Sequence, residues 1–348
     1  MNKEVFEVTI IGGGPAGLFS AFYSGLREMR TKIIEYQPVL GGKIHFYPEK
    51  MIWDVGGLTP VLGEQLINQL VQQGLTFDPE VVLNEKISSI SREQDGTFIL
   101  RTSSGNVHYS KTVIVAVGGG ILKPQKIEIN GAERFELTNL NYTIKSLEKF
   151  KGKTVLISGG GNSAVDWANE LEPIAKQVHL IYRKEALNSH EAQTTQVLQS
   201  STICHFNTTI TKLLANEAQD VITQVELTNH ANGDIHYLNV DEVMISHGFE
   251  RETELLDNSE INVELIDHYF ISGNALSQTS VPGLFAAGDI LKYEGKLNLI
   301  AGAFQDAANA VNQAKLYLSP EAAAGGMVSS HNDLFQSRNR QLIKQLLK

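Results

Sequence analysis

The chain has 348 residues, of which 42% are apolar and 20% charged, a composition typical of a soluble globular protein with about two domains. Its formal net charge of −10 argues against nucleic acid as a partner, because nucleic-acid binding depends on clustered cations. The single cysteine, Cys204, excludes an internal disulfide and fits a reducing compartment. No apolar run is long enough to cross a bilayer and no signal peptide is recognisable, so we expect a cytoplasmic protein with no membrane contact.

The first predicted strand, over 8–11, runs into the glycine-rich turn 12–17 (GGGPAG) and the start of a helix. Small residues at such a turn let backbone amides approach a pyrophosphate at the positive end of the helix. The next predicted strand, over 31–34, ends in Glu35, about 20 residues beyond the first glycine. A carboxylate there accepts hydrogen bonds from a free ribose 2′-hydroxyl, so the turn predicts a site for a dinucleotide with an unphosphorylated ribose.

Two alternating stretches, over 86–91 and 97–102, predict a hairpin around the turn Asp95-Gly96. The nearly all-apolar stretch 112–117 then predicts a parallel strand that is buried on both faces and ends in glycines. A shorter strand of the same kind is predicted over 243–245, again followed by a glycine.

Between these two strands lies a second glycine-rich turn, 159–164 (GGGNSA), after the apolar stretch 155–157. The strand predicted over 178–182 ends in Arg183 and Lys184, and cations at this point accommodate a 2′-phosphate. The second site is therefore predicted to bind NADP(H). Two such sites in one chain imply that electrons pass between two nucleotides.

The symmetric position of the two buried strands predicts that the second nucleotide domain is inserted into the first. The predicted domains are 1–115 and 248–348 for the discontinuous first domain, and 116–247 for the inserted one. Glycines at both crossings would make a hinge. The alternative is a tandem of two unrelated domains.

A third signal follows the stretch 281–287, which predicts a strand ending in Gly288 and Asp289. A carboxylate at this point can accept hydrogen bonds from the ribityl chain of a flavin. The stretch 298–303 predicts a helix start capped by Asn298, whose positive end would face the flavin ring.

In combination these motifs resemble those of the low-molecular-weight thioredoxin-reductase family of flavoproteins. More narrowly, the chain resembles the bacterial ferredoxin (flavodoxin)–NADP reductases of the thioredoxin-reductase type, over essentially its whole length. The resemblance rests on these motifs: 12–17 with Glu35, 41–43 (GGK), 47–50 (YPEK), 159–167 (GGGNSAVDW), 288–289 (GD) and 293–296 (YEGK).

The resemblance implies an α/β fold of two Rossmann-like domains, with FAD in the discontinuous domain and NADP(H) in the inserted one. It implies an oxidoreductase in which nicotinamide delivers a hydride to the flavin, and the flavin passes single electrons to ferredoxin or flavodoxin. It also implies a homodimer and a domain rotation that brings the two rings together. No catalytic residue beyond the flavin is expected, because this transfer needs stacking and orientation rather than a side-chain base.

The family pattern also implies which residues touch each cofactor. Tyr47 would stack on one face of the isoalloxazine ring, although an ordinary half-buried aromatic remains an alternative; core packing is the alternative for Ile87 and Leu122. The residues implied for FAD are Gly12, Gly14, Gly17, Glu35, Gly42, Lys43, Tyr47, Ile87, Leu122, Asp289 and Ser330. Those implied for NADP(H) are Gly159, Gly161, Ala164, Arg183 and Lys184.

The chain departs from the family pattern at three places. Where thioredoxin reductases carry a Cys-x-x-Cys pair, the stretch 139–143 (NLNYT) has no sulfur, so the flavin must hand electrons directly to its acceptor. Asn188 occupies a position that is often basic, which predicts a weaker preference for NADPH. Val328 stands where the ferredoxin reductases carry a histidine on the second flavin face, with His331 three residues further along.

Two other functions stay open at this stage. One is an NADPH diaphorase or oxidase that uses quinones, iron chelates or oxygen, and the other is a redox-sensing regulator that turns over nothing. No metal site is expected, since His190-Glu191 has no second ligand at helical spacing. The tail 337–348 predicts a short basic amphipathic helix that docks on a partner subunit, attracts an acidic carrier, or frays.

Overall fold

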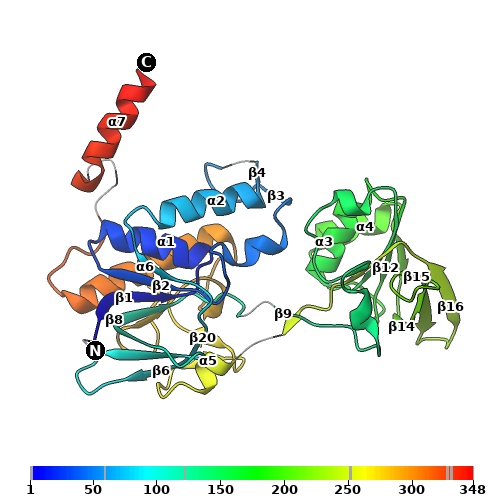
Figure 1. Ribbon diagram of the computed structural model, residues 1–348, viewed down its shortest axis with the longest axis horizontal. Helices are drawn as coiled ribbons and strands as arrows, with labels where there is room; N and C mark the ends of the chain where they lie inside the picture. Colours follow the sequence, from blue (N-terminus) through cyan, green and yellow to red (C-terminus); the bar gives the residue numbers. More distant parts are fainter. Residues whose placement is uncertain are drawn as a thin grey trace. The chain divides into compact units, whose positions relative to one another are not determined.

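The computed structural model describes residues 3–58, 60–120, 123–250, 253–326, 329 and 332–347. The chain divides into two compact units: unit 1 comprises 1–121 and 251–348, and unit 2 comprises 122–250 (Figure 1). Both crossings lie a few residues later than the sequence motifs placed them. The reason is an antiparallel pair inside unit 2, in which β9 (Lys123–Pro124) is bonded to β18 (Phe249–Glu250).

Unit 1 is built on a seven-stranded sheet of order β5-β2-β1-β8-β7-β6, with β21 paired to β8 off this path. β5, β2, β1, β8 and β21 are parallel, whereas β8-β7-β6 is an antiparallel meander that contains the predicted hairpin. The strands are β1 (Val5–Ile11), β2 (Thr31–Ile34), β5 (Glu80–Val82), β6 (Ile87–Arg92), β7 (Phe98–Thr102), β8 (Val107–Val115) and β21 (Leu284–Ala286).

Both faces of this sheet are covered by other elements. Successive residues of the central strands point to opposite sides and therefore pack into two different hydrophobic clusters. Ile114 of β8 belongs to the hydrophobic cluster under the helices α1 (Pro15–Leu26), α2 (Gly63–Gly74) and α6 (Ile300–Leu318). Its neighbours Val113 and Val115 belong to the cluster on the other face. That face carries α5 (Glu254–Asp257) and a small sheet of β19 (Leu265–Ile266), β20 (Phe270–Ser272) and β22 (Leu291–Lys292). Figure 1 shows α1, α2 and α6 together on one side of the sheet and α5 with β20 on the other.

Unit 2 contains a parallel five-stranded sheet of order β10-β17-β11-β12-β13. Its strands are β10 (Leu140–Asn141), β11 (Thr154–Ser158), β12 (Gln177–Ile181), β13 (Ile203–His205) and β17 (Glu242–Ile245). Residues of α3 (Asn162–Leu171) and α4 (Glu191–Gln199) fill the cluster on one face. A three-stranded antiparallel sheet packs on the other: β14 (Thr208–Ala215), β15 (Ile222–Asn229) and β16 (Ile235–Asn239). The sequence motifs did not predict this second sheet.

The stretch before α6 corrects one prediction. The helix begins at Ile300 and its N-cap is Leu299, with no side-chain cap, so Asn298 does not cap it. A Cβ on Gly302 would lie 2.0 Å from the carbonyl oxygen of Leu297, so the chain turns tightly into the helix at this point.

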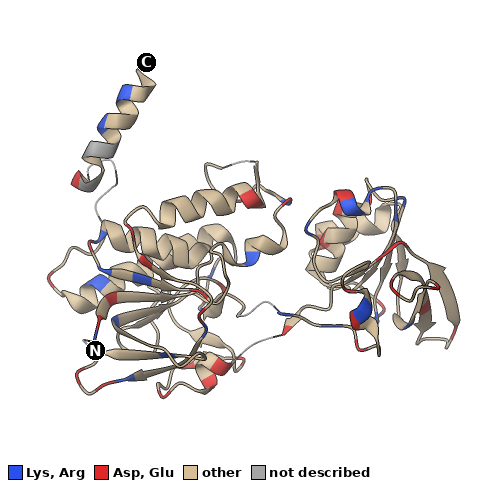
Figure 2. Cartoon of the chain, viewed as in Figure 1, with Lys and Arg blue, Asp and Glu red and all other residues tan. Residues whose placement is uncertain are grey.

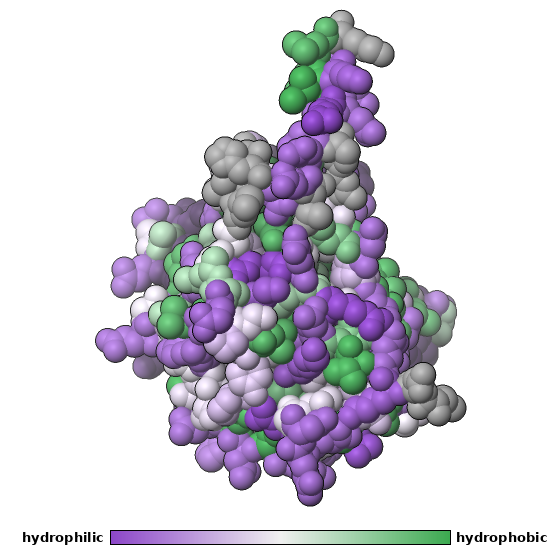
Figure 3. Space-filling view, turned by 90° about the vertical axis from the view of Figure 1, so that its left-hand side faces the viewer, coloured by the Kyte–Doolittle hydropathy of each residue, from purple (hydrophilic) through white to green (hydrophobic). Residues whose placement is uncertain are grey.

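The smaller elements of unit 1 include a helix at the C-terminal end. The predicted tail helix is present as α7 (Gln336–Leu346), and Figure 2 colours the charged residues of its described part. Leu346 and Leu347 are more than four-fifths exposed, and apolar residues gather at this end of the helix in Figure 3. The remaining short elements of unit 1 are η1 (Gly42–Phe46), β3 (Met51–Ile52), β4 (Val61–Leu62), η4 (Gly288–Ile290) and η6 (Asp333–Phe335). Unit 2 also contains η2 (Ala132–Phe135) and η3 (Glu148–Phe150). Among the described residues, no helix combines the length and the hydropathy that a membrane span requires.

Candidate nucleotide-binding sites

The glycine-rich turn of unit 1 needs a residue without a side chain for two different reasons. Gly12 has φ +108°, and a Cβ there would lie 2.4 Å from the carbonyl oxygen of Ala116, so the fold itself requires glycine. Gly14 has an ordinary φ of −78°, and a Cβ there would meet only the Cα of Gly42, at 3.7 Å. Gly14 therefore leaves free the space directly in front of α1.

The N-terminus of α1 is free to bind an anion. Gly14 is its N-cap, no side chain caps the helix, and Pro15 occupies the first turn. The first amides of a helix have no intrahelical acceptor, and the helix dipole favours negative charge at this end. Gly42 borders the same space, because its own Cβ would lie 2.7 Å from the Cα of Gly14. The turn and the start of α1 thus fit a pyrophosphate.

Glu35 follows β2 and is bonded to the turn itself. The residue is 8% exposed; its Oε2 accepts a 2.6 Å hydrogen bond from the Gly13 amide, and its Oε1 accepts a 2.7 Å bond from the Gln37 amide. A carboxylate has about four acceptor positions, so each oxygen keeps capacity for a ribose hydroxyl. The Glu85 amide donates to the carbonyl of Glu35, which brings the start of β6 close to this end of the site. Ile87 is 4% exposed, and its side chain packs in a hydrophobic core cluster of unit 1.

Tyr47 and Asp289, two of the predicted FAD contacts, both belong to unit 1. Tyr47 ends η1 and is half-buried against the helical cluster; Asp289 lies on η4 and is exposed. Burial, together with the negative charges of Asp289 and Asp54, raises the pKa of the Tyr47 phenol to about 12. Lys43, directly after Gly42, is exposed.

The glycine-rich turn of unit 2 repeats the geometry of the first. Gly159 has φ +152°, and a Cβ there would lie 2.3 Å from the carbonyl oxygen of Ser246 at the end of β17. Gly161 has φ −90° and is the N-cap of α3 without a side-chain cap; a Cβ on it would meet only the carbonyl oxygen of Asn188, at 4.0 Å. Ala164 is buried inside the turn of the helix. This turn also fits a pyrophosphate.

Cations rather than a carboxylate follow β12 in unit 2. Arg183 and Lys184 are exposed, and neither forms an ion pair with the part of the chain that the structure describes. Tyr182 packs beneath the turn, since a Cβ on Gly160 would lie 2.3 Å from its ring. His247 contacts Ser158 Oγ through Nε2 at 2.8 Å, and burial followed by the charge of Arg183 lowers its pKa. Two exposed cations beside the turn fit the 2′-phosphate of NADP(H).

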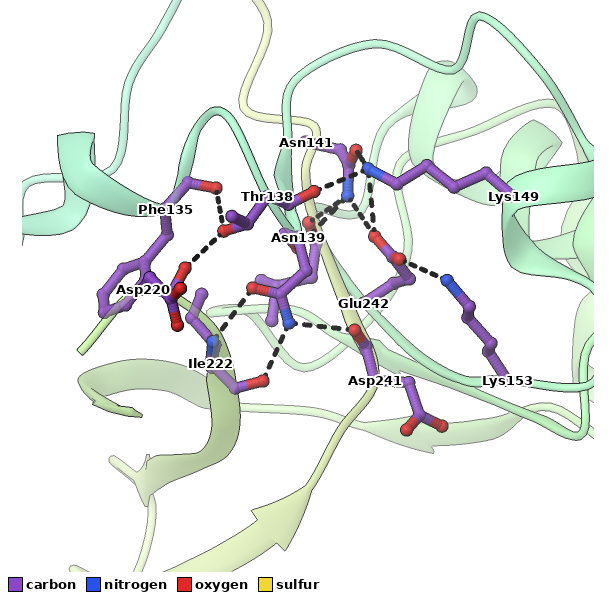
Figure 4. A network of polar contacts seen from close by, with 11 residues as sticks. Phe135, Thr138, Asn139, Asn141, Lys149, Lys153, Asp220, Ile222, Asp241 and Glu242 are labelled. Carbon is purple, nitrogen blue, oxygen red and sulfur yellow. Dashed lines mark hydrogen bonds and ion pairs between the residues drawn. The ribbon is translucent and has the colours of Figure 1, made fainter. Parts of the chain in front are cut away.

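The segment that replaces the dithiol is held in a network of polar contacts (Figure 4). Asn139 is 4% exposed; its amide nitrogen donates to the carbonyls of Ile222 and Asp241, and its Oδ1 accepts from the Ile222 amide. Glu242 is also buried and accepts from Asn141, Lys149 and Lys153. Motif spacing gave no signal for this network, because its partners are far apart in the sequence. The segment joins β10 and the ends of β15 and β17 rather than offering a redox centre.

Three further predictions concern the remaining FAD residues, the single cysteine and the metal ligands. Leu122 and Ser330, predicted to touch FAD, lie outside the described residues, as do Val328 and His331. Burial raises the pKa of the half-buried Cys204 thiol, which disfavours its reactive thiolate. Within the described ranges, no group of three or more His, Cys, Asp or Glu side chains is placed to hold a metal ion.

The chain is similar to known proteins over most of its length. A family model described as pyridine nucleotide-disulphide oxidoreductase matches residues 6–314. A curated relative from Bacillus mycoides (strain KBAB4), named ferredoxin–NADP reductase 1, is 68% identical and covers 100% of this chain and 99% of its own. One from Bacillus cytotoxicus with the same name is 68% identical over the full length of both chains. The crystal structure of T. acidophilum thioredoxin reductase has a TM-score of 0.76 at 23% identity, covering 92% of this chain and 100% of that one, which shows a shared fold.

Proposed function

We propose, from the premise that the chain belongs to the pyridine nucleotide-disulphide oxidoreductase family, that it is a ferredoxin–NADP reductase. In this function it is an FAD-dependent enzyme that moves electrons between NADPH and ferredoxin or flavodoxin. The observation that carries the proposal is the pair of alike turns that end in opposite charges, Glu35 in unit 1 and Arg183 with Lys184 in unit 2. Full-length relatives named for this activity support it.

Unit 1 would hold FAD. Its pyrophosphate fits the first amides of α1 in front of Gly14, and Glu35 would accept hydrogen bonds from the adenosine ribose. Asp289 would bind the ribityl chain while Tyr47 covers one face of the ring. When bound, FAD supplies hydride acceptance from NADPH and single-electron release to the carrier.

Unit 2 would hold NADPH. The pyrophosphate fits the start of α3 in front of Gly161, and Arg183 with Lys184 would pair with the 2′-phosphate. Hydride transfer requires the nicotinamide to be placed on the flavin, so unit 2 must orient it and exclude water rather than supply a base. We infer that the units rotate about their two crossing segments to do this.

The acceptor would be a one-electron carrier. The chain has one cysteine, and the segment 139–143 is tied into the Asn139 and Glu242 network, so no dithiol relays electrons to thioredoxin. A flavin without such a relay must pass its electrons directly to the partner. Ferredoxin and flavodoxin are carriers of this kind. We further propose that the enzyme is a cytoplasmic homodimer.

The test is spectroscopic. The purified chain should be yellow, NADPH should bleach it anaerobically, and added ferredoxin should restore the oxidised spectrum faster than oxygen does. Asp289→Ala should yield largely colourless protein, because the exposed carboxylate expected to bind the ribityl chain is lost. A chain that never holds a flavin would refute the proposal. Rapid reoxidation by oxygen with no effect of ferredoxin would instead indicate an oxidase.

A further inference from the structure

A fully buried carboxylate lies beneath the turn that presents Asp289. Asp306, in the middle of α6, is 0% exposed and forms an ion pair through Oδ2 with Lys296, whose side chain is 5% exposed. Its Oδ1 accepts a 2.9 Å hydrogen bond from the Tyr293 hydroxyl, and Oδ2 also accepts a 3.1 Å bond from the Gly288 amide. The donors are thus two side chains and one backbone amide.

The position of Gly288 gives this network its significance. Gly288 has φ +76°, and a Cβ on it would lie 3.0 Å from the Cβ of Ala16 in the first turn of α1. The turn 288–290 is therefore wedged between α6 and the helix end that fits the pyrophosphate. Asp306 bonds the amide directly before Asp289. One carboxylate thus connects the expected pyrophosphate site with the expected ribityl ligand.

The energetics favour a fixed arrangement. A buried carboxylate is costly unless it is paired and its lone pairs are used, and here a cation, a phenol and an amide all donate to it. Hydrogen bonds to an ionised acceptor are about twice as strong as neutral ones. Burial, followed by the hydrogen bond and charge of Asp306, raises the pKa of Tyr293 to about 12, so the phenol stays protonated and remains a donor at neutral pH.

We propose that Asp306 is a positioning residue for FAD: by holding the Gly288 amide on a charge-paired carboxylate, it fixes the backbone that aims Asp289 at the ribityl chain. The inference rests on the proposed function, since it takes unit 1 as the FAD site. It differs from a purely structural ion pair in one respect. A structural pair would stabilise unit 1 with or without FAD, whereas a positioning residue changes FAD affinity at equal stability.

Two double variants separate these roles. Asp306→Asn/Lys296→Met removes both charges but keeps a carbonyl oxygen that accepts from Gly288. Asp306→Leu/Lys296→Met removes the same charges and the acceptor as well. Each full-length chain is titrated with FAD by flavin fluorescence, and the unfolding midpoint is measured without FAD. Glu242→Gln, at a buried lysine-paired carboxylate of unit 2, is the control that should leave FAD affinity unchanged.

We expect the asparagine variant to bind FAD within about threefold of the wild type, and the leucine variant to bind at least about tenfold more weakly, at similar unfolding midpoints. Equal FAD affinity of the two variants would overturn the inference while leaving the proposed function intact. A wild-type chain that binds no FAD would overturn both.

A milder variant covers the case in which a double variant does not fold. Tyr293→Phe removes one donor to Asp306 and leaves the ion pair and the Gly288 bond in place. The holoenzyme of this variant should release FAD about threefold faster on dilution, measured by the return of flavin fluorescence. An unchanged release rate would count against the positioning role.

Discussion

The two glycine-rich turns have nearly the same backbone and differ in how their charged residues are held. Gly12 and Gly159 both pack against a carbonyl at the end of the neighbouring strand, with a Cβ that would lie 2.4 Å and 2.3 Å from it. Glu35, however, is buried and bonded to its own turn, while Arg183 is exposed and unpaired within the described chain.

This difference separates a resident ligand from an exchanging one. A charged group that is already ordered loses little entropy on binding, and such preorganisation favours tight binding. An exposed arginine must be ordered by each incoming ligand, which lowers affinity and favours exchange. The comparison supports a permanently held FAD in unit 1 and a nucleotide in unit 2 that binds and leaves in every turnover.

The largest expected effect comes from closing the open space in each turn. In Gly14→Ala and Gly161→Ala the new methyl has no close protein neighbour and the backbone is not strained, so it meets only the ligand. Gly14→Ala should weaken FAD binding by about 10- to 100-fold, and Gly161→Ala should raise the KM for NADPH by a similar factor at full flavin content. Flavin titration and steady-state kinetics measure the two. If Gly14→Ala instead raised the KM for NADPH and Gly161→Ala weakened FAD binding, the two units would bind the opposite cofactors.

A smaller effect is expected from removing one free cation. Arg183→Ala should raise the KM for NADPH about tenfold and leave that for NADH unchanged, because only NADPH carries the phosphate that pairs with the guanidinium. Lys176→Ala, another exposed cation of unit 2, is the matched control and should change neither. Equal effects of Arg183→Ala on both nucleotides would show that the phosphate is bound elsewhere.

The smallest effect concerns the pH stability of unit 2, where three histidine rings stack. His205 lies between His179 and His236, and burial followed by their charges lowers its pKa from 6.5 to about 4. The unfolded chain therefore binds the proton first, so this stability is complete above pH 6.5 and is lost as the pH falls toward 4. Allowing for partial exposure, we expect a loss of about 1 kcal/mol.

The measurement uses urea unfolding at pH 7 and pH 5. In a Trp53→Phe background, Trp167 of α3 is the single tryptophan and reports on unit 2. His205→Phe keeps an aromatic ring in the stack but cannot titrate, so its unfolding midpoint should fall less between the two pH values. A fall as large as in the background chain would show that the titration of His205 is not responsible.

The parts of the structure that local sequence encodes were predicted well. The α/β class is confirmed, and the structure contains the predicted hairpin of β6 and β7 and the tail helix, because glycine turns, alternation and helical periodicity are short-range signals. The site residues themselves stay predictions, although the geometry of both turns supports them.

The parts that depend on long-range contacts were not predicted. Asn139 forms hydrogen bonds with Ile222 and Asp241, and Asp306 accepts a hydrogen bond from the Gly288 amide. The partners in these bonds are distant along the chain. No periodicity marks such pairs. One local signal was available, since Asp306 is an acid on the alanine-rich buried face of α6, beside Ala303, Ala307 and Ala310. The predicted cap at Asn298 is wrong because a local signal can also mislead. A residue type that favours capping does not by itself determine where the helix begins.

The antiparallel pairing of β9 with β18 has an evolutionary consequence. Lys123 faces Glu250 across this pair, so the two segments by which the chain enters and leaves unit 2 lie side by side. Residues 123–250 therefore form an insertion whose two ends are adjacent, and exchange of this segment between homologues would leave the sheet of unit 1 unchanged.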